Sequence, residues 1–405
     1  MENEWKSYSL GEICSYSKER INIQDVTNKN YISTENMFPD KGGITEAATL
    51  PNVKSVSRYE KGDTLISNIR PYFKKIWFSN KIGGASNDVL VIKGKSEKVF
   101  NKYLYYFLTQ DKFFDYVMGT SKGTKMPRGD KDAILKYDIK LPPLDEQKAI
   151  AKVLSDLDEK IGVNNKINKK LEEMAQAIFK QWFVDFEFPN EEGKPYKSSG
   201  GEMVESELGM IPKGWYSKSL LDIADYLNGL AIQKFRPGDD EKGIPVLKIK
   251  ELRQGKTDEN SDLCSLNIDP KYIIHDGDVI FSWSGSLLVD FWCSGKCGLN
   301  QHLFKVTSSK FEKWFYYLWT KYHLDKFIRI AKDKATTMGH IKRADLSNSI
   351  VLVPNEVIMN KANLILNPII EKIIQARIEE RKLSQLRDTL LPKLMSGEIR
   401  VALEN

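Results

Sequence analysis

The sequence is poor in the residues from which metal and redox sites are usually built. It contains four His and four Cys among 405 residues. The cysteines, Cys14, Cys264, Cys293 and Cys297, are too few and too scattered for a disulfide framework. Cys293 and Cys297, with His302 beyond them, suggest zinc, but a lone C-x-x-x-C lacks a second ligand pair, and small core or surface thiols are the alternative. We therefore expect no metal and no cofactor.

Membrane segments and a strong charge of one sign are also missing. No apolar run approaches the ~18 residues of a membrane span, and the polar, acidic start 1–4 (MENE) is unlike a signal peptide. The expected location is the cytoplasm, without a membrane partner. With 61 Lys and Arg against 55 Asp and Glu, the net charge is +6, which permits a polyanionic partner without requiring one.

Enzyme signatures are absent or incomplete. An adenine methyltransferase would need an acid or Asn before Pro-Pro and an aromatic residue after it, whereas Pro142-Pro143 lies between Leu141 and Leu144. Gly94-Lys95-Ser96 lacks the upstream Gly of a P-loop, because Val89 occupies that position. We expect no catalysis by this chain.

A nuclease is the remaining enzyme class with some resemblance. Pro39-Asp40 and Asp138-Ile139-Lys140 mimic a nuclease signature. Such short patterns occur by chance, and here the two parts are far apart. Activity of the chain without partners would be needed to support this interpretation.

One long helix is the strongest local signal. Between 144 and 182, apolar and Asn residues recur at alternating spacings of four and three, which is the seam of a heptad helix: Ile150, Leu154, Leu157, Ile161, Asn164, Asn168, Leu171, Ala175, Ile178 and Trp182. Pro142 and Pro143 mark its start, and Asp145 and Glu146 place negative charge in the first turn. At 1.5 Å per residue such a rod is roughly 58 Å long and needs a partner helix.

The chain is a direct repeat, which supplies that partner. The segment 5–10 (WKSYSL) matches 215–220 (WYSKSL), an offset of 215 − 5 = 210. The segment 62–66 (GDTLI) matches 277–281 (GDVIF) at offset 215, and later matches fall at 211 and 212. A drift of only a few residues indicates two copies of one domain, each followed by its own helix.

Each copy is predicted to be an α+β domain. Strand-like runs occur at 64–69, 75–78 and 89–92, and an aromatic-rich helix is expected at 101–114 and again at 312–327. A Gly, Lys and Thr segment follows in each copy, at 119–129 and 332–342, and then a short strand leads into the long helix.

The expected domain plan has five parts. They are a first domain 1–143, a central helix 144–188, a linker 189–213, a second domain 214–355, and a distal helix with a C-terminal tail 356–405. Two direct repeats bury their helix stripes most simply in an antiparallel coiled coil with pseudo-two-fold symmetry and a domain at each end.

Two details of the coiled coil are hypotheses. Asn164 and Asn168 are expected to lie opposite Ala376 and Glu380 and to fix the register through a polar layer, the alternative being that they face solvent or another protein. Pro392 is expected to kink or end the second helix.

Four motifs resemble the specificity subunit of type I restriction-modification systems. They are 141–150 (LPPLDEQKAI), 178–183 (IFKQWF), 207–215 (ELGMIPKGW) and 390–398 (LLPKLMSGE), which follow the family's order on its two-copy plan over the whole chain. The second helix departs from the pattern, because it begins after Val353-Pro354-Asn355-Glu356 instead of L-P-P-L-x-E-Q.

This resemblance implies a non-catalytic DNA-recognition protein. In that family two target-recognition domains each read one half of a bipartite asymmetric site in double-stranded DNA. The two helices set the spacing and dock two methyltransferase (M) subunits, which use S-adenosylmethionine. Restriction (R) subunits, which cleave DNA with ATP-driven translocation, complete the endonuclease.

Phosphate contacts by Lys and Arg and base contacts by polar side chains are expected in both domains. The first-domain candidates are Lys18, Arg20, Asn68, Arg70, Lys122, Lys125 and Arg128. Those of the second are Lys234, Arg236, Ser282, Trp283, Ser284, Lys334, Thr337, His340, Lys342 and Arg343. A nucleic-acid-binding scaffold without sequence specificity remains the alternative function; salt-sensitive, sequence-independent binding would favour it.

Overall fold

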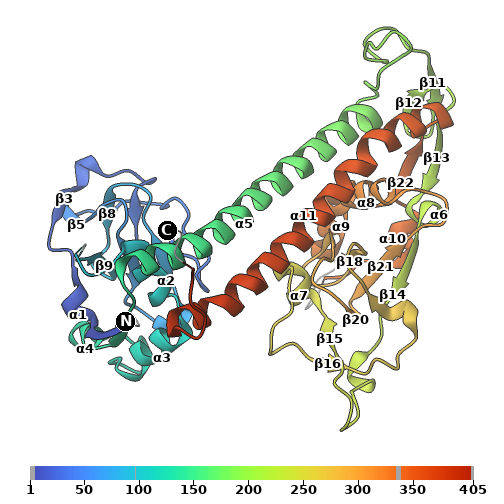
Figure 1. Ribbon diagram of the computed structural model, residues 1–405. Helices are drawn as coiled ribbons and strands as arrows, with labels where there is room; N and C mark the ends of the chain where they lie inside the picture. Colours follow the sequence, from blue (N-terminus) through green and yellow to red (C-terminus); the bar gives the residue numbers. More distant parts are fainter. Residues whose placement is uncertain (1–4, 96, 334–338, 403–405) are drawn as a thin grey trace. The chain divides into compact units, whose positions relative to one another are not determined.

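The computed structural model describes residues 5–95, 97–333 and 339–402. The chain divides into two compact units (Figure 1). The first unit contains 1–159 and 384–405, and the second contains 160–383. Each unit therefore contains one predicted domain together with parts of both long helices.

Two four-stranded sheets form the first domain, with short helices around them. One sheet has the order β2-β9-β6-β7: Cys14–Tyr16, Val89–Gly94, Thr64–Ser67 and Ile76–Phe78. The other has the order β3-β5-β8-β4: Arg20–Asn22, Ser55–Tyr59, Gly83–Ala85 and Tyr31–Ile32. A further pair, β1 (Lys6–Ser9) with β10 (Asp138–Leu141), joins the start of the domain to the strand before the long helix. The helices are α1 (Leu10–Ile13), α2 (Asn101–Leu108), α3 (Asp111–Gly119) and α4 (Lys131–Leu135).

The second domain repeats this topology. Its sheets are β14-β21-β18-β19 (Asp225–Asn228, Leu303–Thr307, Val279–Ser282, Leu288–Phe291) and β16-β15-β20-β17 (Leu263–Cys264, Ile244–Leu247, Cys297–Leu299, Ile273–Ile274). The strand β13 (Tyr216–Ser219) pairs with β22 (Ile350–Val353) as β1 does with β10. The helices are α6 (Leu220–Ile223), α7 (Ile249–Gln254), α8 (Lys313–Tyr322), α9 (Leu324–Asp333) and α10 (Arg343–Ser347).

The copies differ at one sheet edge. Both contain a strand with one parallel and one antiparallel neighbour: β8 between β4 and β5, and β20 between β15 and β17. The fourth strand is added beyond β5 in the first domain and beyond β15 in the second. The shared part of the fold is thus extended on opposite edges.

The predicted aromatic helices are each broken in two. In the first copy α2 ends at Leu108, and the Thr109 hydroxyl donates a 2.6 Å hydrogen bond to the Tyr106 carbonyl, a local bond that competes with helix continuation. The chain then turns extended at Gln110 before α3. In the second copy the break lies at His323, between α8 and α9.

The helix α5 (Leu144–Phe179) starts directly after Pro143, as the proline pair predicts, and is followed by a π-helical turn, Lys180–Val184. All ten predicted seam residues are buried or half-buried, which confirms the heptad stripe. Its partner α11 (Glu356–Ser396) is 41 residues long and continues through Pro392. Pro392 was expected to kink or end this helix; it does not end it, and Leu394 and Met395 beyond it are buried in the first core.

Ion pairs show that the helices run antiparallel within each unit. In the first unit Asp158 binds Arg387 at 2.8 Å, and Glu146 near the start of α5 binds Arg400 beyond the end of α11. In the second unit Glu172 binds Arg377 at 2.5 Å, while Asn164 Nδ2 donates to Glu379 Oε2 at 2.9 Å. Asn164 thus meets Glu379, where the sequence predicted Ala376 and Glu380.

The residues Glu146 and Gln147, in the first turn of α5, have a clear structural function. Gln147 is buried. Its amide nitrogen Nε2 donates to the Lys98 and Pro142 carbonyls, and its Oε1 accepts a hydrogen bond from the Phe100 N–H. Glu146 is 3% exposed and accepts two hydrogen bonds from the Arg400 guanidinium. These two residues therefore fix the neighbouring loop and the C-terminal tail.

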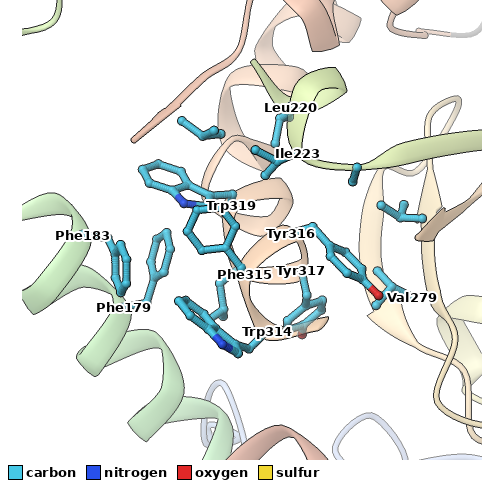
Figure 2. Packing of buried hydrophobic residues seen from close by; sticks show 14 of the residues in the cluster. Phe179, Phe183, Leu220, Ile223, Val279, Trp314, Phe315, Tyr316, Tyr317 and Trp319 are labelled. Atoms are coloured by element: carbon cyan, nitrogen blue, oxygen red, sulfur yellow. The ribbon is translucent and has the colours of Figure 1, made fainter. Parts of the chain in front are cut away.

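The core of the second unit is largely aromatic (Figure 2). Helix α8 places Trp314, Phe315 and Trp319 against Phe179 and Phe183, at the end of α5 and in the π-helical turn. The rings of Phe179 and Trp319 meet edge-on at 5.0 Å, and those of Phe183 and Trp314 lie 5.3 Å apart. The end of the first long helix is thereby packed into the second domain.

The segment 189–213, expected as a linker, is ordered. It contains the hairpin β11 (Met203–Ser206) and β12 (Gly209–Pro212), and Ile211 is buried. Phe188 stacks between Tyr196 and Trp215 at 4.5 and 5.3 Å. Its polar composition concealed a hairpin anchored by a few aromatic residues.

Candidate nucleic-acid interface

Three segments of the first domain are joined into one surface, called loop surface 1: 68–70, 86–88 and 122–129. The Asn68 N–H donates to the Asp88 carbonyl at 2.8 Å, and the Arg70 N–H donates to the Pro127 carbonyl at 2.8 Å. The Gly129 N–H returns to the Asn68 carbonyl at 3.1 Å. Two predicted groups of DNA-binding residues, far apart in sequence, thus lie together.

Loop surface 2, in the second domain, consists of 283–285, 300–302 and 339–341. Here the Trp283 N–H donates to the His302 carbonyl at 3.4 Å, and the Gly285 N–H donates to the Gly339 carbonyl at 2.9 Å. The Ile341 N–H donates to the Trp283 carbonyl at 3.1 Å. The second domain therefore also brings together the connection between β18 and β19, the turn between β20 and β21, and the segment before α10.

The two surfaces correspond bond by bond. The strand-connection residues are related by 215 (283 − 68), and those of the late segment by 212 (341 − 129). The turns 86–88 and 300–302 are related by 214 (302 − 88), and with these three offsets each of the three hydrogen bonds of loop surface 1 has its counterpart in loop surface 2. The backbone is repeated, while all nine side chains of loop surface 2 differ from their counterparts in loop surface 1.

Loop surface 1 carries exposed cations held by polar neighbours. Arg20 donates to Asn87 Oδ1 at 3.3 Å, and Arg128 pairs with Asp88 at 3.3 Å. Lys122 pairs with Asp130 at 2.6 Å, and this hydrogen bond lowers the pKa of the Asp130 carboxyl. The side chains of Lys18, Arg70 and Lys125 are also exposed. The result is a positively charged surface on a fixed backbone.

Loop surface 2 is more aromatic. The Trp283 indole N–H donates to Asn228 Oδ1 at 3.0 Å, and its ring lies 5.8 Å from that of Phe304 and 6.3 Å from His340. Ser284 Oγ lies 3.1 Å from His302 Nδ1. His340 is exposed and lies where loop surface 1 has Arg128, while the Trp283 indole lies where loop surface 1 has Asn68.

Lys342 and Arg343, both exposed, continue this surface at the start of α10. The Lys342 N–H donates to Asp345 Oδ2 at 2.7 Å, a helix-capping bond. Arg343 Nη1 reaches the Tyr226 carbonyl at 3.4 Å.

Three predicted site residues are buried. Asn68 is 8% exposed, Ser282 is fully buried, and Ser284 is 4% exposed. Ser282 Oγ donates to the Ser284 carbonyl, and the Asn68 backbone makes two of the bonds that join loop surface 1. These residues shape the loops from inside and present little side chain to solvent.

Two of the remaining candidates, Lys234 and Arg236, are not tied to loop surface 2 by any described contact. Lys234 lies in a 3-10 turn, Ile232–Lys234, and Arg236 follows it; both are exposed. Lys334 and Thr337 lie outside the residues that the structure describes.

Sequence reasoning missed the turns 86–88 and 300–302. Asn87 and Asp88 hold Arg20 and Arg128, and His302 holds Ser284. A usable signal was present, since both turns are polar and directly follow a strand with Gly at an equivalent position, Gly84 and Gly298.

The four thiols are buried in the cores. Burial raises the pKa of Cys293 to about 11 and of Cys297 to about 12, so neither is a thiolate near neutral pH. Among the described residues no group of three or more His, Cys, Asp or Glu side chains is placed to hold a metal ion. Within the same residues, no helix is long and apolar enough to cross a membrane.

Comparison with known proteins gives a consistent result. The Methylase_S family, "Type I restriction modification DNA specificity domain", matches residues 2–173 and again 212–383. The chain is 28% identical to the type I restriction enzyme MjaIX specificity subunit of Methanocaldococcus jannaschii, over 98% of this chain and 93% of that protein. It is 23% identical to the HindI specificity subunit of Haemophilus influenzae, over 98% and 100%.

A solved structure supports the fold. The crystal structure of the type I restriction-modification system S subunit from M. genitalium aligns with a TM-score of 0.59 at 13% identity, over 97% of both chains. The two family matches together span most of this chain, each covering one domain and much of its long helix. The chain belongs to the type I restriction-modification DNA specificity family.

Proposed function

We propose that this chain is the DNA-reading subunit of a type I restriction-modification complex, with domains 1–143 and 214–355 each reading one half of a bipartite asymmetric site. The observation that carries the proposal is the pair of loop surfaces, which share three backbone hydrogen bonds but not their side chains. One scaffold that presents two different sets of side chains is suited to two different half-sites, because base readout depends on individual side chains.

The exposed cations are assigned to phosphates. Arg20, Arg70, Lys122, Lys125 and Arg128 surround loop surface 1, where they can bind the backbone and fix the register of the protein on the duplex. On loop surface 2 this role falls to Lys342 and Arg343. Trp283 and His340 are the groups there suited to base edges and thymine methyl groups.

The helices are proposed to set the spacing between half-sites and to dock methyltransferase subunits. A helix of 36 residues is about 54 Å long, which lies between one and two turns of B-DNA. Methylation and cleavage are assigned to the M and R partners, and this chain contributes recognition alone.

The test is a genome-wide map of adenine methylation in a methylation-free host that expresses this chain with its neighbouring methyltransferase subunit. We expect one bipartite motif, lost when the chain is omitted. Exchanging residues 1–143 for those of another family member should change one half-site and preserve the other. If both halves changed together, the modular assignment would be wrong.

A matched pair of variants separates readout from scaffold binding. Trp283→Ala should relax specificity in one half-site, whereas Lys125→Ala should weaken binding to all sequences and flatten its salt dependence by ~0.9 in log–log slope. Equal binding to every duplex by the unaltered complex would instead support the scaffold without sequence specificity.

A further inference from the structure

The connection between β6 and β7 carries two aromatic rings into solvent. Residues 70–74 (RPYFK), here called the aromatic turn, include a 3-10 turn, Pro71–Phe73. Tyr72 is 46% exposed and Phe73 is 37% exposed, and their ring centroids lie 4.6 Å apart. Exposed apolar side chains that lie side by side are a feature of interaction sites.

The backbone of this turn is held in an uncommon conformation. Arg70 and Lys74 have φ angles of 49° and 50°, in the left-handed region that non-glycine residues rarely occupy. Asp40 and Lys41, in the facing turn, have φ angles of 52° and 63°. Such conformations persist where surrounding structure enforces them, and they gather at functional sites.

The enforcing contacts are present. The Asp40 N–H donates to the Phe73 carbonyl at 2.8 Å, and the Lys41 N–H donates to the Lys74 carbonyl at 3.0 Å. The ammonium groups of Lys41 and Lys74 both form ion pairs with the Asp111 carboxylate of α3, at 3.0 and 3.1 Å. The rings therefore project from a support fixed on two sides.

The turn adjoins loop surface 1. The bond from Arg70 to Pro127 places it beside Met126, which is 48% exposed, with Lys125 and Arg128 on either side of that segment. Aromatic groups ringed by Arg and Lys match a partner with a phosphate backbone and flat, stacked bases.

The second domain lacks this device. Its equivalent connection, 283–287, is shorter than 68–75, and its one aromatic residue, Trp283, packs on Phe304 and donates to Asn228. Any function of the aromatic turn belongs to one half-site.

We propose that the aromatic turn inserts into the duplex of the half-site read by the first domain and stacks Tyr72, backed by Phe73, on an opened base step. This inference rests on the proposed function and adds a component of shape readout, because steps that unstack easily accept the ring at lower cost. Arg70 and Arg128 neutralise the phosphates on either side.

The experiment uses the complex of this chain with its methyltransferase subunit and a duplex carrying the bipartite motif found by methylation mapping. 5-Iodouracil replaces one thymine at a time, on either strand of each half-site, and crosslinked peptides are mapped after irradiation. We expect a crosslink to Tyr72 or Phe73 from one half-site only. Tyr72→Ala should weaken specific binding about tenfold, and Tyr72→Trp should restore it.

Two controls separate stacking from charge and from general surface effects. Tyr72→Ala should leave the salt dependence unchanged, whereas Arg70→Ala should reduce its slope by ~0.9. Tyr216→Ala, a 48% exposed tyrosine in β13, should not alter binding.

The outcomes distinguish the two proposals. If the unaltered complex binds its mapped motif but neither ring crosslinks and Tyr72→Ala binds equally well, the insertion is refuted and the proposed function stands. If the unaltered complex shows no sequence preference, the proposed function fails, and the insertion with it.

Discussion

At two pairs of equivalent positions, the two units hold the long helices by different chemistry. In the first unit Glu146 binds Arg400, and Asp158 binds both Arg387 and the Tyr106 hydroxyl. The repeat offset of 212 (356 − 144) maps these helix and tail positions onto the second unit. There the equivalents are Ile358 with Phe188 and Ile370 with Ala175, all buried in the aromatic core.

This difference shows that one repeated fold can support the same helix pairing with ions or with apolar contacts. A buried ion pair requires complementary geometry and loses much when one partner is removed. An apolar contact depends on volume and is insensitive to salt. At these positions the first unit should therefore respond to salt and charge, and the second to cavities, while the Glu172–Arg377 ion pair of the second unit lies elsewhere along the helices.

The largest effect is expected from a cavity in the second core. Phe183→Ala removes a fully buried ring that contacts Trp215, Trp314 and Phe315, and should lower the unfolding free energy of that unit by about 4 kcal/mol. Calorimetry of the full chain would detect it. Met395→Ala, at the equivalent position of the first unit, should cost less, because a flexible thioether leaves a gap that can relax. Equal losses of unfolding free energy in the two variants would contradict the proposed difference between the two cores.

The histidine-linked part of the pH dependence should be confined to the second unit, which contains all four histidines. Burial lowers the pKa of His323 to about 4, while its Nε2 donates to the Ile350 carbonyl. Between pH 6.5 and 4 the unfolded chain binds a proton that the folded chain does not. The free energy of unfolding therefore decreases as the pH is lowered, by roughly 3 kcal/mol over the whole window.

Acid titration of the unfolding transition measures this slope. His323→Gln should flatten it, and His275→Gln, at an exposed position, should not. An unchanged slope in His323→Gln would assign the acid sensitivity elsewhere.

The ion pairs of the first unit provide the next effect. Asp158→Asn leaves Arg387 and Tyr106 imperfectly paired and should destabilise that unit by about 2 kcal/mol. Added salt should reduce this difference. The control is Asp156→Asn, in an exposed pair with Lys152, with an expected change within about 0.5 kcal/mol. Equal changes in both variants would contradict the distinction.

The smallest stability effect is expected midway along α5. Asn168 is 6% exposed, and its Oδ1 has no hydrogen-bond partner among the described residues, so Asn168→Leu should be neutral or stabilising by about 1 kcal/mol. The double variant with Asn164→Leu tests whether these residues fix the register. Unchanged assembly and unchanged spectra of spin labels across the helices would show that they do not.

Much of the candidate site followed from local sequence, but its assembly did not. The segments containing Arg70 and Arg128 were both predicted: the first because it directly follows a strand, and the second because a segment rich in Gly, Lys and Thr occupies equivalent places in the two copies. Their joining through the bond from Arg70 to Pro127 depends on how the sheet brings residues 57 positions apart into contact. The burial of Asn68, Ser282 and Ser284 was equally invisible, since polar side chains after a strand are usually exposed.

The sequence by itself determined the two-copy plan, the family, the start of α5 at Leu144 and the buried stripe along it. These features are periodic or local, so the side chains specify them without knowledge of distant contacts. Only the tertiary structure decided that α11 continues past Pro392, that residues 203–212 form a hairpin, that Glu146 binds Arg400, and which loops build the two surfaces. The physical reason is that burial against distant residues can outweigh a helix breaker or a polar composition, and no local pattern records that contact.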